Sequence, residues 1–317
     1  MTCGILFVAI LTALEVIGRE LGHRAMVVDR PALWSLERER LSESGSQTLV
    51  FLGASRMQQD IATDVLRRRL PGWAVVQLAV NGRYPVATLV DLAEDEEFTG
   101  VVVMAASGLG LAPDRMDDQR TLLDHYHRRW SPSVKFDRQI RTAIETNLVL
   151  INPYTRYWRS LMRSLESRPL PTPYYKVLQP DRSRPVHFDE VDVEEKKEKR
   201  LRSAVFYYEL TPRLGPEGWL ENVRRLEPAV AAIRERGGQV VFLRMPTSGR
   251  HWELDEEHYP RAEYWDRFAA STSAPAIHFR DVPGMDVECP DTSHLGVAES
   301  KQFTEALASE LMSLGVL

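Results

Sequence analysis

Ser55, Asp291 and His294 could together form a nucleophilic catalytic site. Ser55 lies just after a short apolar run, and Asp291 precedes His294 by three residues near the C-terminus. A histidine whose Nδ1–H is held by an aspartate can accept the proton of a serine hydroxyl at Nε2. Taken alone, each feature has a simpler interpretation: Ser55 as a helix cap, and Asp291 or Ser293 as the cap of the last helix, with His294 on the surface.

Asn81 and Gly82 close a second apolar run and offer a way to stabilise negative charge. Because Gly82 has no side chain, its backbone N–H could approach a substrate oxygen closely. The backbone N–H of Ser55, at the start of a helix, could be a second donor. Considered in isolation, Asn81-Gly82 is an ordinary turn, so this interpretation depends on where the fold places it.

Apolar runs alternate with helical patterns on both sides of a long irregular stretch. Uninterrupted apolar strands indicate a parallel sheet that is covered on both faces. We therefore predict an α/β fold, a three-layer sandwich around a central, mainly parallel sheet of the flavodoxin-like kind. The predicted strands are residues 48–52, 74–80, 101–106, 239–244 and 276–279, and the predicted helices are residues 61–70, 86–97, 219–236 and 297–314. Sites in such sheets lie beyond the carboxyl ends of the strands, where Ser55 and Gly82 fall.

Together these features resemble the SGNH (GDSL-like) hydrolase superfamily over roughly residues 47–112 and 215–317. The family's Gly-Asp-Ser or Gly-Ser-Ser turn is matched by Gly53-Ala54-Ser55, its second block by QLAVNG at residues 77–82, and its Asp-x-x-His block by Asp291 and His294. The resemblance implies that Ser55 is the nucleophile and Gly82 an oxyanion donor. It also implies that His294 is the general base, oriented by Asp291.

The third block of that family, Gly-x-Asn-Asp, is not matched. The corresponding residues 105–110 read AASGLG and lack the asparagine that completes the family's oxyanion hole. The resemblance then implies that Ser107 or a backbone N–H takes its place, or that activity is weak or lost. Arg56 and Asn81, next to the nucleophile and to Gly82, complete the predicted oxyanion and substrate-binding residues.

The Ser-Arg pair at 55–56, the apolar N-terminus and MPTS at 245–248 resemble the membrane-anchored bacterial SGNH-like proteins of surface polysaccharide modification, including those of alginate O-acetylation. This implies an esterase or O-acyltransferase acting on acyl, above all acetyl, esters of cell-surface carbohydrate, with a membrane acyl-donor protein as a partner.

Two alternatives stay open. One is a catalytically degenerate SGNH fold that binds or assembles a surface polysaccharide. In that case Ser55 and His294 would lie out of hydrogen-bond reach, or the insertion would fill the cleft. The other is a cytoplasmic lipase-like esterase in which the apolar N-terminal segment belongs to the core.

The overall composition excludes several classes of protein. The chain has 317 residues and a formal charge of −5, with a mean hydropathy of −0.29. These values argue against wholesale disorder, a polytopic membrane protein and a nucleic-acid partner bound through a broad basic face. Cys3 and Cys289 are too few for a disulfide framework or a four-cysteine zinc site. We expect no cofactor and no metal, since His251, Asp255 and His258 have helical spacing but lack the order HExxH.

Residues 4–14 (GILFVAILTAL) are uncharged and strongly apolar. A membrane-spanning helix needs roughly 20 predominantly apolar residues, so this segment is short for one. We predict that residues 1–20 are an N-terminal signal anchor, residues 21–46 a connector, and residues 47–317 the SGNH-like domain on the periplasmic face of the inner membrane. The alternative is a buried helix or a first strand.

Residues from about 113 to 212 interrupt the α/β alternation and read as an insertion of helices and loops. Within it, EEKKEKRLR at residues 194–202 most simply forms a solvated helix face. His125 and His127 could bind a carbohydrate or an acidic group, or belong to a solvated helix. The aromatic residues of the insertion could stack on sugars or pack it onto the core: Tyr154, Tyr157, Trp158, Tyr174 and Tyr175.

Overall fold

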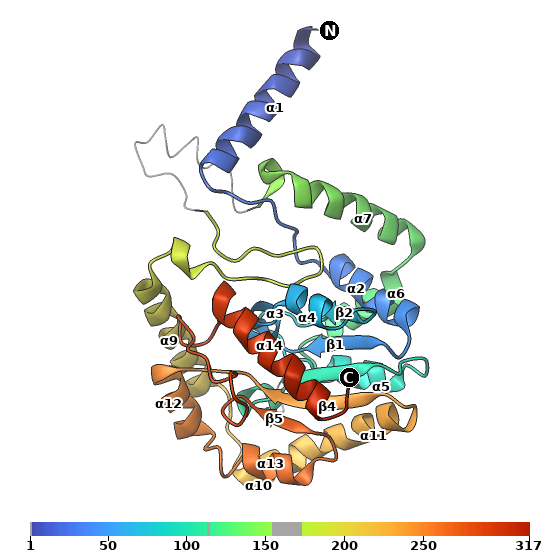
Figure 1. The fold of residues 1–317 in the computed structure, drawn as a ribbon, viewed down its shortest axis with the longest axis vertical. Helices are drawn as coiled ribbons and strands as arrows, with labels where there is room; N and C mark the ends of the chain where they lie inside the picture. The colour runs from blue at the N-terminus through green and yellow to red at the C-terminus, as the bar shows by residue number, and fades with distance from the viewer. Residues whose placement is uncertain (1, 113–114, 154–172) are drawn as a thin grey trace.

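The computed structural model describes residues 2–112, 115–153 and 173–317, and in this part of the chain the strands form a five-stranded sheet of order β2-β1-β3-β4-β5 (Figure 1). Every neighbouring pair in that sheet is parallel. The strands are β1 (Thr48–Leu52), β2 (Ala74–Gln77), β3 (Val101–Ala105), β4 (Gln239–Arg244) and β5 (Ala276–His278). The predicted three-layer α/β fold with a central parallel sheet is confirmed.

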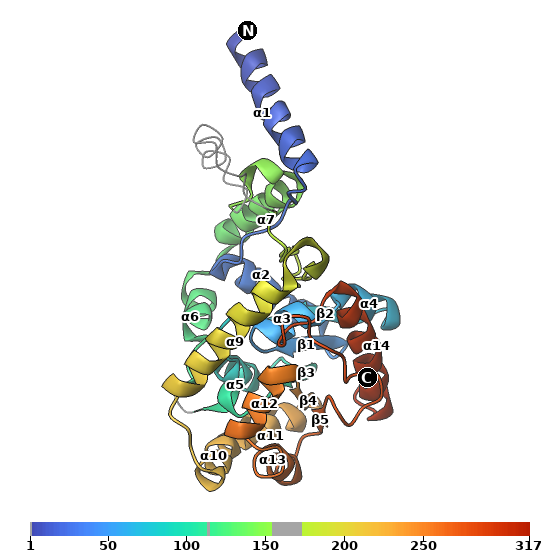
Figure 2. The same cartoon turned by 90° about the vertical axis from the view of Figure 1, so that its left-hand side faces the viewer.

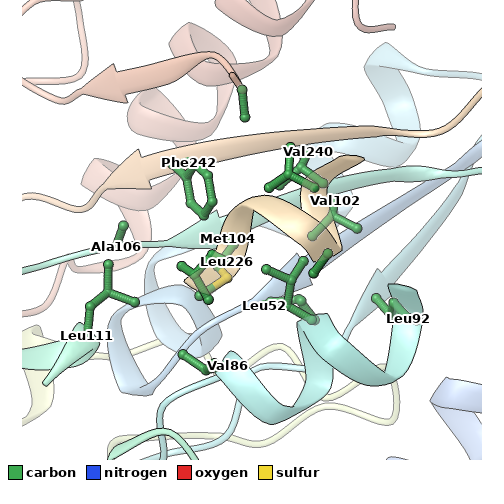
Figure 3. Packing of buried hydrophobic residues seen from close by; sticks show 14 of the residues in the cluster. Leu52, Val86, Leu92, Val102, Met104, Ala106, Leu111, Leu226, Val240 and Phe242 are labelled. Carbon is green, nitrogen blue, oxygen red and sulfur yellow. The ribbon is translucent and has the colours of Figure 1, made fainter. Parts of the chain in front are cut away.

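Side chains alternate between the two faces of the sheet along each strand, so each face packs against its own layer of helices. Val50, Leu52 and Val102 pack on one face against apolar residues of α5, α11 and α2, part of which Figure 3 shows. Leu49 and Phe51, one residue out of phase, pack on the other face against α3, α4 and α14. Both faces are therefore buried, which is why the strands are apolar throughout.

The helices that cover the sheet lie on both sides of the insertion. On the N-terminal side they are α2 (Pro31–Ser44), α3 (Ser55–Asp60), α4 (Thr63–Arg69), α5 (Val86–Glu94) and the short helix η1 (Leu109–Leu111). On the C-terminal side they are α10 (Pro216–Val223), η5 (Arg224–Leu226), α11 (Glu227–Glu235), α12 (Gly249–His258), α13 (Trp265–Ser271) and α14 (Val297–Ser313).

Residues 31–44 correct the prediction of a connector over residues 21–46. They form α2, and its residues Leu33, Trp34 and Leu41 are buried. Trp34 packs in the core cluster on one face of the sheet, and its indole N–H donates to the carbonyl oxygen of Leu78 at 3.0 Å. The many charged residues of this segment made its buried apolar residues hard to recognise in the sequence. Because these apolar residues pack in the core, α2 belongs to the domain.

Helix α1 (Thr2–Glu20) extends away from the rest of the molecule (Figures 1 and 2). Most of its apolar side chains, such as Ile5, Leu6 and Phe7, are exposed, so the alternative in which this segment is part of the core is wrong. No helix in the described part of the chain combines the length and the hydropathy that a membrane span requires. Towards its C-terminal end the helix contacts the insertion, where Glu15 accepts hydrogen bonds from the backbone N–H groups of Val149 and Leu150 and Arg19 donates to the carbonyl oxygen of Asn147.

The described part of the insertion consists of helices, short turns and one irregular hairpin. Its helices are α6 (Arg120–Arg129), α7 (Pro132–Asn147), η3 (Val149–Ile151), η4 (Phe188–Glu190) and α9 (Val193–Leu210). In the hairpin Lys176 pairs with Val186, and buried Arg182 donates to the carbonyl oxygens of Gln77 and Ala79 at 2.8 and 3.1 Å. Arg182 thereby attaches the hairpin to the end of β2. Helix α9 lies in front of the sheet, beside α12 (Figure 2).

Candidate active site

Ser55, His294 and Asp291 form a continuous chain of hydrogen bonds. The Oγ of Ser55 lies 3.0 Å from Nε2 of His294, and Nδ1 of the same ring lies 2.9 Å from Oδ2 of Asp291. His294 and Asp291 are almost fully buried, whereas Ser55 lines a cavity. An ionised carboxylate only accepts hydrogen bonds, which assigns the proton to Nδ1 and leaves Nε2 to accept from the serine hydroxyl. This is the arrangement that an activated serine nucleophile requires.

The tight turn between the end of β1 and the start of α3 presents Ser55 to the cavity. A Cβ at Gly53 would lie 2.5 Å from the Cβ of Met57, so only glycine fits this turn. Ser55 is the first residue of α3, with Ala54 at the cap position, and its hydroxyl faces His294. The simple reading of Ser55 as a helix cap is therefore wrong.

The loop before α14 holds the histidine in place through Asp291. One carboxylate oxygen of Asp291 accepts from the backbone N–H groups of Ser293 and His294 at 3.0 and 2.7 Å, while the other binds the imidazole. Thr292 adopts φ 70°, a left-handed conformation that is rare for a β-branched residue. Gly296 occupies the cap position of α14, so neither Asp291 nor Ser293 caps that helix.

The surroundings of the imidazole favour its neutral form. Burial lowers the pKa of His294 to about 3, and the cationic Lys176 and Arg200 act in the same direction, while Asp291 opposes them. The pKa of Asp291 is held well below its usual range by His294, Arg200 and Lys176, although burial acts in the opposite direction. At neutral pH the pair is therefore a neutral imidazole beside a carboxylate, the protonation state of a general base.

The predicted oxyanion and substrate-binding residues border the same cavity as Ser55, which has a volume of about 520 Å³. They are Arg56, Asn81, Gly82 and Ser107. Gly82 has φ +73°, a conformation that favours glycine. The hydroxyl of Ser107 accepts from the backbone N–H of Gly110 at 3.1 Å, so its own proton can point to a substrate oxygen. The structure brings these residues together, and their roles stay predictions.

Arg56 and Asp255 connect the cavity wall to an internal polar network. Arg56 donates to Oγ of Ser293 at 3.1 Å and lies 2.9 Å from Nε2 of His251. Asp255 is bound by Arg244 and by the hydroxyl of Tyr208. His251 and Asp255 thus have protein partners.

His258 is the third residue of the set with helical spacing, after His251 and Asp255. Its ring is stacked on Tyr208, with 4.5 Å between the ring centroids. Its Nδ1 lies 3.0 Å from the carbonyl oxygen of Leu254. All three residues contact neighbouring side chains or backbone, while the buried Nδ1 of His251 has no hydrogen-bond partner among the described residues.

The insertion supplies cavity residues that the sequence interpretation missed. Residues 194–202 are only partly the solvated face that was predicted, because one side of α9 borders the cavity. The cavity-facing residues are Lys196, Lys199, Arg200, Ser203, Ala204, Tyr207 and Tyr208. Their spacing of three or four residues was the available signal, since it places them on one face of a helix.

The remaining sequence candidates have other contacts. Nδ1 of His125 lies 2.9 Å from Oγ of Ser35, and His127 contacts the carboxylate of Asp91. Both histidines therefore tie α6 to α2 and α5. Of the aromatic residues considered for sugar stacking, Tyr174 and Tyr175 border the cavity, while Tyr154, Tyr157 and Trp158 lie outside the described residues.

Comparisons with known proteins give little beyond this geometry. No family model matches the chain, and no curated protein matches it. Among solved structures it is similar to the crystal structure of TesA, with 14% sequence identity and a TM-score of 0.36 over 84% of this chain and 99% of that chain. Both values are low, so this similarity carries no information on what the present chain binds or does.

Proposed function

We propose that the protein is an SGNH-type serine esterase or O-acyltransferase that acts on acyl esters, above all acetyl esters, of carbohydrate. The observation that carries the proposal is the chain from Ser55 through His294 to Asp291, at 3.0 and 2.9 Å, beside a cavity of about 520 Å³. The arrangement meets the geometric requirements of a nucleophile, a general base and an orienting carboxylate.

The first half of the reaction forms an acyl-enzyme. Nε2 of His294 takes the hydroxyl proton as Oγ of Ser55 attacks the ester carbonyl carbon, and the carbonyl oxygen becomes an oxyanion. The backbone N–H groups of Ser55 and Gly82 and the hydroxyl of Ser107 are the proposed donors to that oxygen. When the intermediate collapses, the bond to the alcohol oxygen breaks, and the imidazolium returns its proton to the leaving alcohol.

The second half depends on which hydroxyl reaches the acyl-enzyme. Water gives a carboxylic acid and makes the protein an esterase, whereas a sugar hydroxyl gives a new ester and makes it an O-acyltransferase. In both cases His294 removes the proton of the acceptor and passes it to Oγ of Ser55. Tyr174, Tyr175 and Tyr207 also border the cavity, and aromatic rings are suited to stacking on a sugar, which supports a carbohydrate as acceptor or leaving group.

The geometry argues against a catalytically degenerate binding protein. That alternative requires Ser55 and His294 to be out of hydrogen-bond reach or the cleft to be filled by the insertion. Neither condition is met in the described residues: the two side chains are 3.0 Å apart, and the insertion borders the cavity without filling it.

The test is hydrolysis of p-nitrophenyl acetate by the purified protein, with and without acetyl-accepting oligosaccharides. We expect turnover that is abolished in Ser55→Ala and retained in Ser309→Ala, a matched loss of one exposed hydroxyl. Acetylated oligosaccharide in the product would identify a transferase, and acetate alone an esterase. A well-folded protein that hydrolyses no ester and transfers no acetyl group contradicts the proposal.

We also propose that α1 attaches the domain to the periplasmic face of the inner membrane, where a membrane protein supplies the acyl group. The support is the exposed apolar surface of α1, including Leu6 and Ile10. In vesicle flotation, the paired change Leu6→Glu and Ile10→Glu should abolish membrane association, whereas Leu314→Glu, at another exposed apolar site, should not. Equal flotation of both variants contradicts membrane attachment through α1.

A further inference from the structure

The cavity at Ser55 has a charge opposite to that of the whole chain. The chain carries a formal charge of −5, yet cationic side chains dominate the described residues that border the cavity. These are Arg56, Arg115, Lys176, Arg184, Lys196, Lys199, Arg200 and Arg244. Against them stand the carboxylates of Asp255 and Asp291. Clustering of one sign of charge in a cleft focuses its potential on whatever enters.

Helix α9 separates its charges between two faces. Lys196, Lys199 and Arg200 border the cavity, at the spacing that places residues on one side of a helix. The acidic residues of the same stretch, Glu194, Glu195 and Glu198, are exposed and are not cavity residues. On the outer face Lys197 and Arg202 each pair with one of them at 3.4 Å. The outer cations are therefore compensated within the helix.

Some cavity cations already have counter-charges. Arg244 binds Asp255, and Nε of Arg200 lies 3.7 Å from Oδ2 of Asp291. Lys196 lies 3.0 Å from Glu195. In contrast, Lys176, Arg184 and Lys199 form no ion pair with the described residues.

Two of these cations, Lys176 and Arg184, are buried, so the lack of a direct ion pair is costly for them. Lys176 and Arg184 are each 8% exposed. Arg184 donates to the hydroxyl of Tyr174 at 3.1 Å, but its buried Nε has no hydrogen-bond partner among the described residues. Burial of a cation disfavours its charged form, and at Lys176 this effect outweighs the opposing charges of Asp291 and Asp60. Burial accordingly lowers the pKa of Lys176 to about 8.

Tyr175 joins the hairpin and α9 into one surface. The Nζ atoms of Lys176 and Lys196 lie 5.3 and 5.8 Å from the centre of its ring. The contact of Arg200 with Asp291 places this surface directly against the candidate catalytic residues. A group bound by these cations would therefore belong to the molecule whose ester meets Ser55.

We propose that Lys176, Arg184 and Lys199 form a subsite for an anionic oxygen group, a carboxylate or a phosphate, on the carbohydrate that Ser55 acylates or deacylates. This inference rests on the proposed function and specifies its substrate as an acidic carbohydrate. Charge-assisted hydrogen bonds from lysine and arginine are suited to either group, and Arg184 can offer its unused Nε–H.

The test measures direct binding, so its outcome does not depend on catalysis. Isothermal titration calorimetry of the full chain would compare oligogalacturonate, which carries carboxylates, with a phosphorylated oligosaccharide and with neutral xylo-oligosaccharide. We expect an anionic ligand to bind at least tenfold more tightly than the neutral one, with an affinity that falls as salt is added. The anionic ligand that binds more tightly shows whether the subsite prefers a carboxylate or a phosphate.

Substitutions within one helix supply the matched comparison. Lys199→Gln and Lys176→Gln should each weaken binding of the anionic ligand about ten- to a hundredfold. Lys197→Gln, which removes the same charge from the outer face of α9, should leave binding unchanged. Equal affinity for neutral and anionic ligands, or equal effects of Lys197→Gln and Lys199→Gln, overturns the subsite. Anionic binding without any esterase or transferase activity would instead contradict only the proposed function.

Discussion

Nε of Arg200 lies 3.7 Å from Oδ2 of Asp291, the same oxygen that holds the imidazole of His294. Arg200 belongs to α9 in the insertion, and Asp291 lies in the loop before α14. The insertion therefore contributes charge directly to the candidate catalytic residues. Because Arg200 lowers the pKa of both His294 and Asp291, it favours the neutral imidazole and the ionised carboxylate.

The first prediction concerns the pH dependence of catalysis. A general base acts in its neutral form, so activity is present above the pKa of His294 and is lost as the pH falls through it. Burial lowers that pKa from 6.5 to about 3, so the acid limb of kcat/KM should lie well below pH 6.5 in the wild type. Arg200→Gln removes a charge that lowers this pKa and should move the limb upward by about half a pH unit. Arg202→Gln, on the outer face, is the control, and identical profiles for both variants contradict the electrostatic role of Arg200.

The second prediction separates the two functions of Asp291. Asp291→Asn keeps an oxygen to accept from the backbone N–H groups of Ser293 and His294, so the loop should stay folded. Its amide group cannot accept the Nδ1–H of His294 in the way a carboxylate does, which disfavours the reactive tautomer. We expect kcat to fall on the order of 10³–10⁴-fold with little change in melting temperature. Wild-type turnover in this variant would show that Asp291 has no part in catalysis.

The third prediction concerns Ser107, which stands where the SGNH pattern has an asparagine. If its hydroxyl donates to the oxyanion, Ser107→Ala should lower kcat about a hundredfold and leave KM nearly unchanged. Ser107→Asn should recover part of the loss, because an amide N–H can serve as the donor. Thermal melting of Ser107→Ala shows whether losing the hydrogen bond from the backbone N–H of Gly110 also destabilises the fold. An unchanged kcat in Ser107→Ala would assign the oxyanion to backbone donors alone.

The fourth prediction concerns stability. Arg182 is fully buried and binds Asp29 as well as two carbonyl oxygens at the end of β2. Arg182→Ala leaves these acceptors without a donor and should lower the free energy of unfolding by about 2–4 kcal/mol in urea titrations. Arg68→Ala, which breaks an exposed ion pair with Asp64, should cost less than about 1 kcal/mol. Similar losses in both variants would contradict the anchoring role of Arg182.

The sheet was largely predictable from sequence because its strands are buried on both faces. The strands at residues 48–52 and 239–244 have the predicted bounds, and the others are shorter by one to three residues at their ends. The predicted helix at 61–70 was less accurate. The helical region begins earlier, at Ser55, and is interrupted between α3 and α4. Near the cavity, hydrogen bonds to distant residues override the apolar spacing, as when Asp60 accepts from the backbone N–H of Leu295 at 3.0 Å.

The site was predictable only in part. Ser55, Gly82 and the Asp291–His294 pair could be found because each follows or precedes a regular element at the carboxyl edge of the sheet. The contribution of α9 was harder to find, because the spacing of its residues predicts a shared helix face but does not show that this face meets the cavity. That depends on tertiary contacts such as the one between Arg200 and Asp291.

Labelling with a fluorophosphonate, followed by intact-mass and peptide mass spectrometry, tests directly whether Ser55 is an activated nucleophile. We expect one adduct per chain, located on Ser55, which is absent in Ser55→Ala and forms far more slowly in His294→Ala. Lack of labelling in well-folded wild-type protein, or an adduct that persists in Ser55→Ala, would contradict the assignment of Ser55 as the nucleophile.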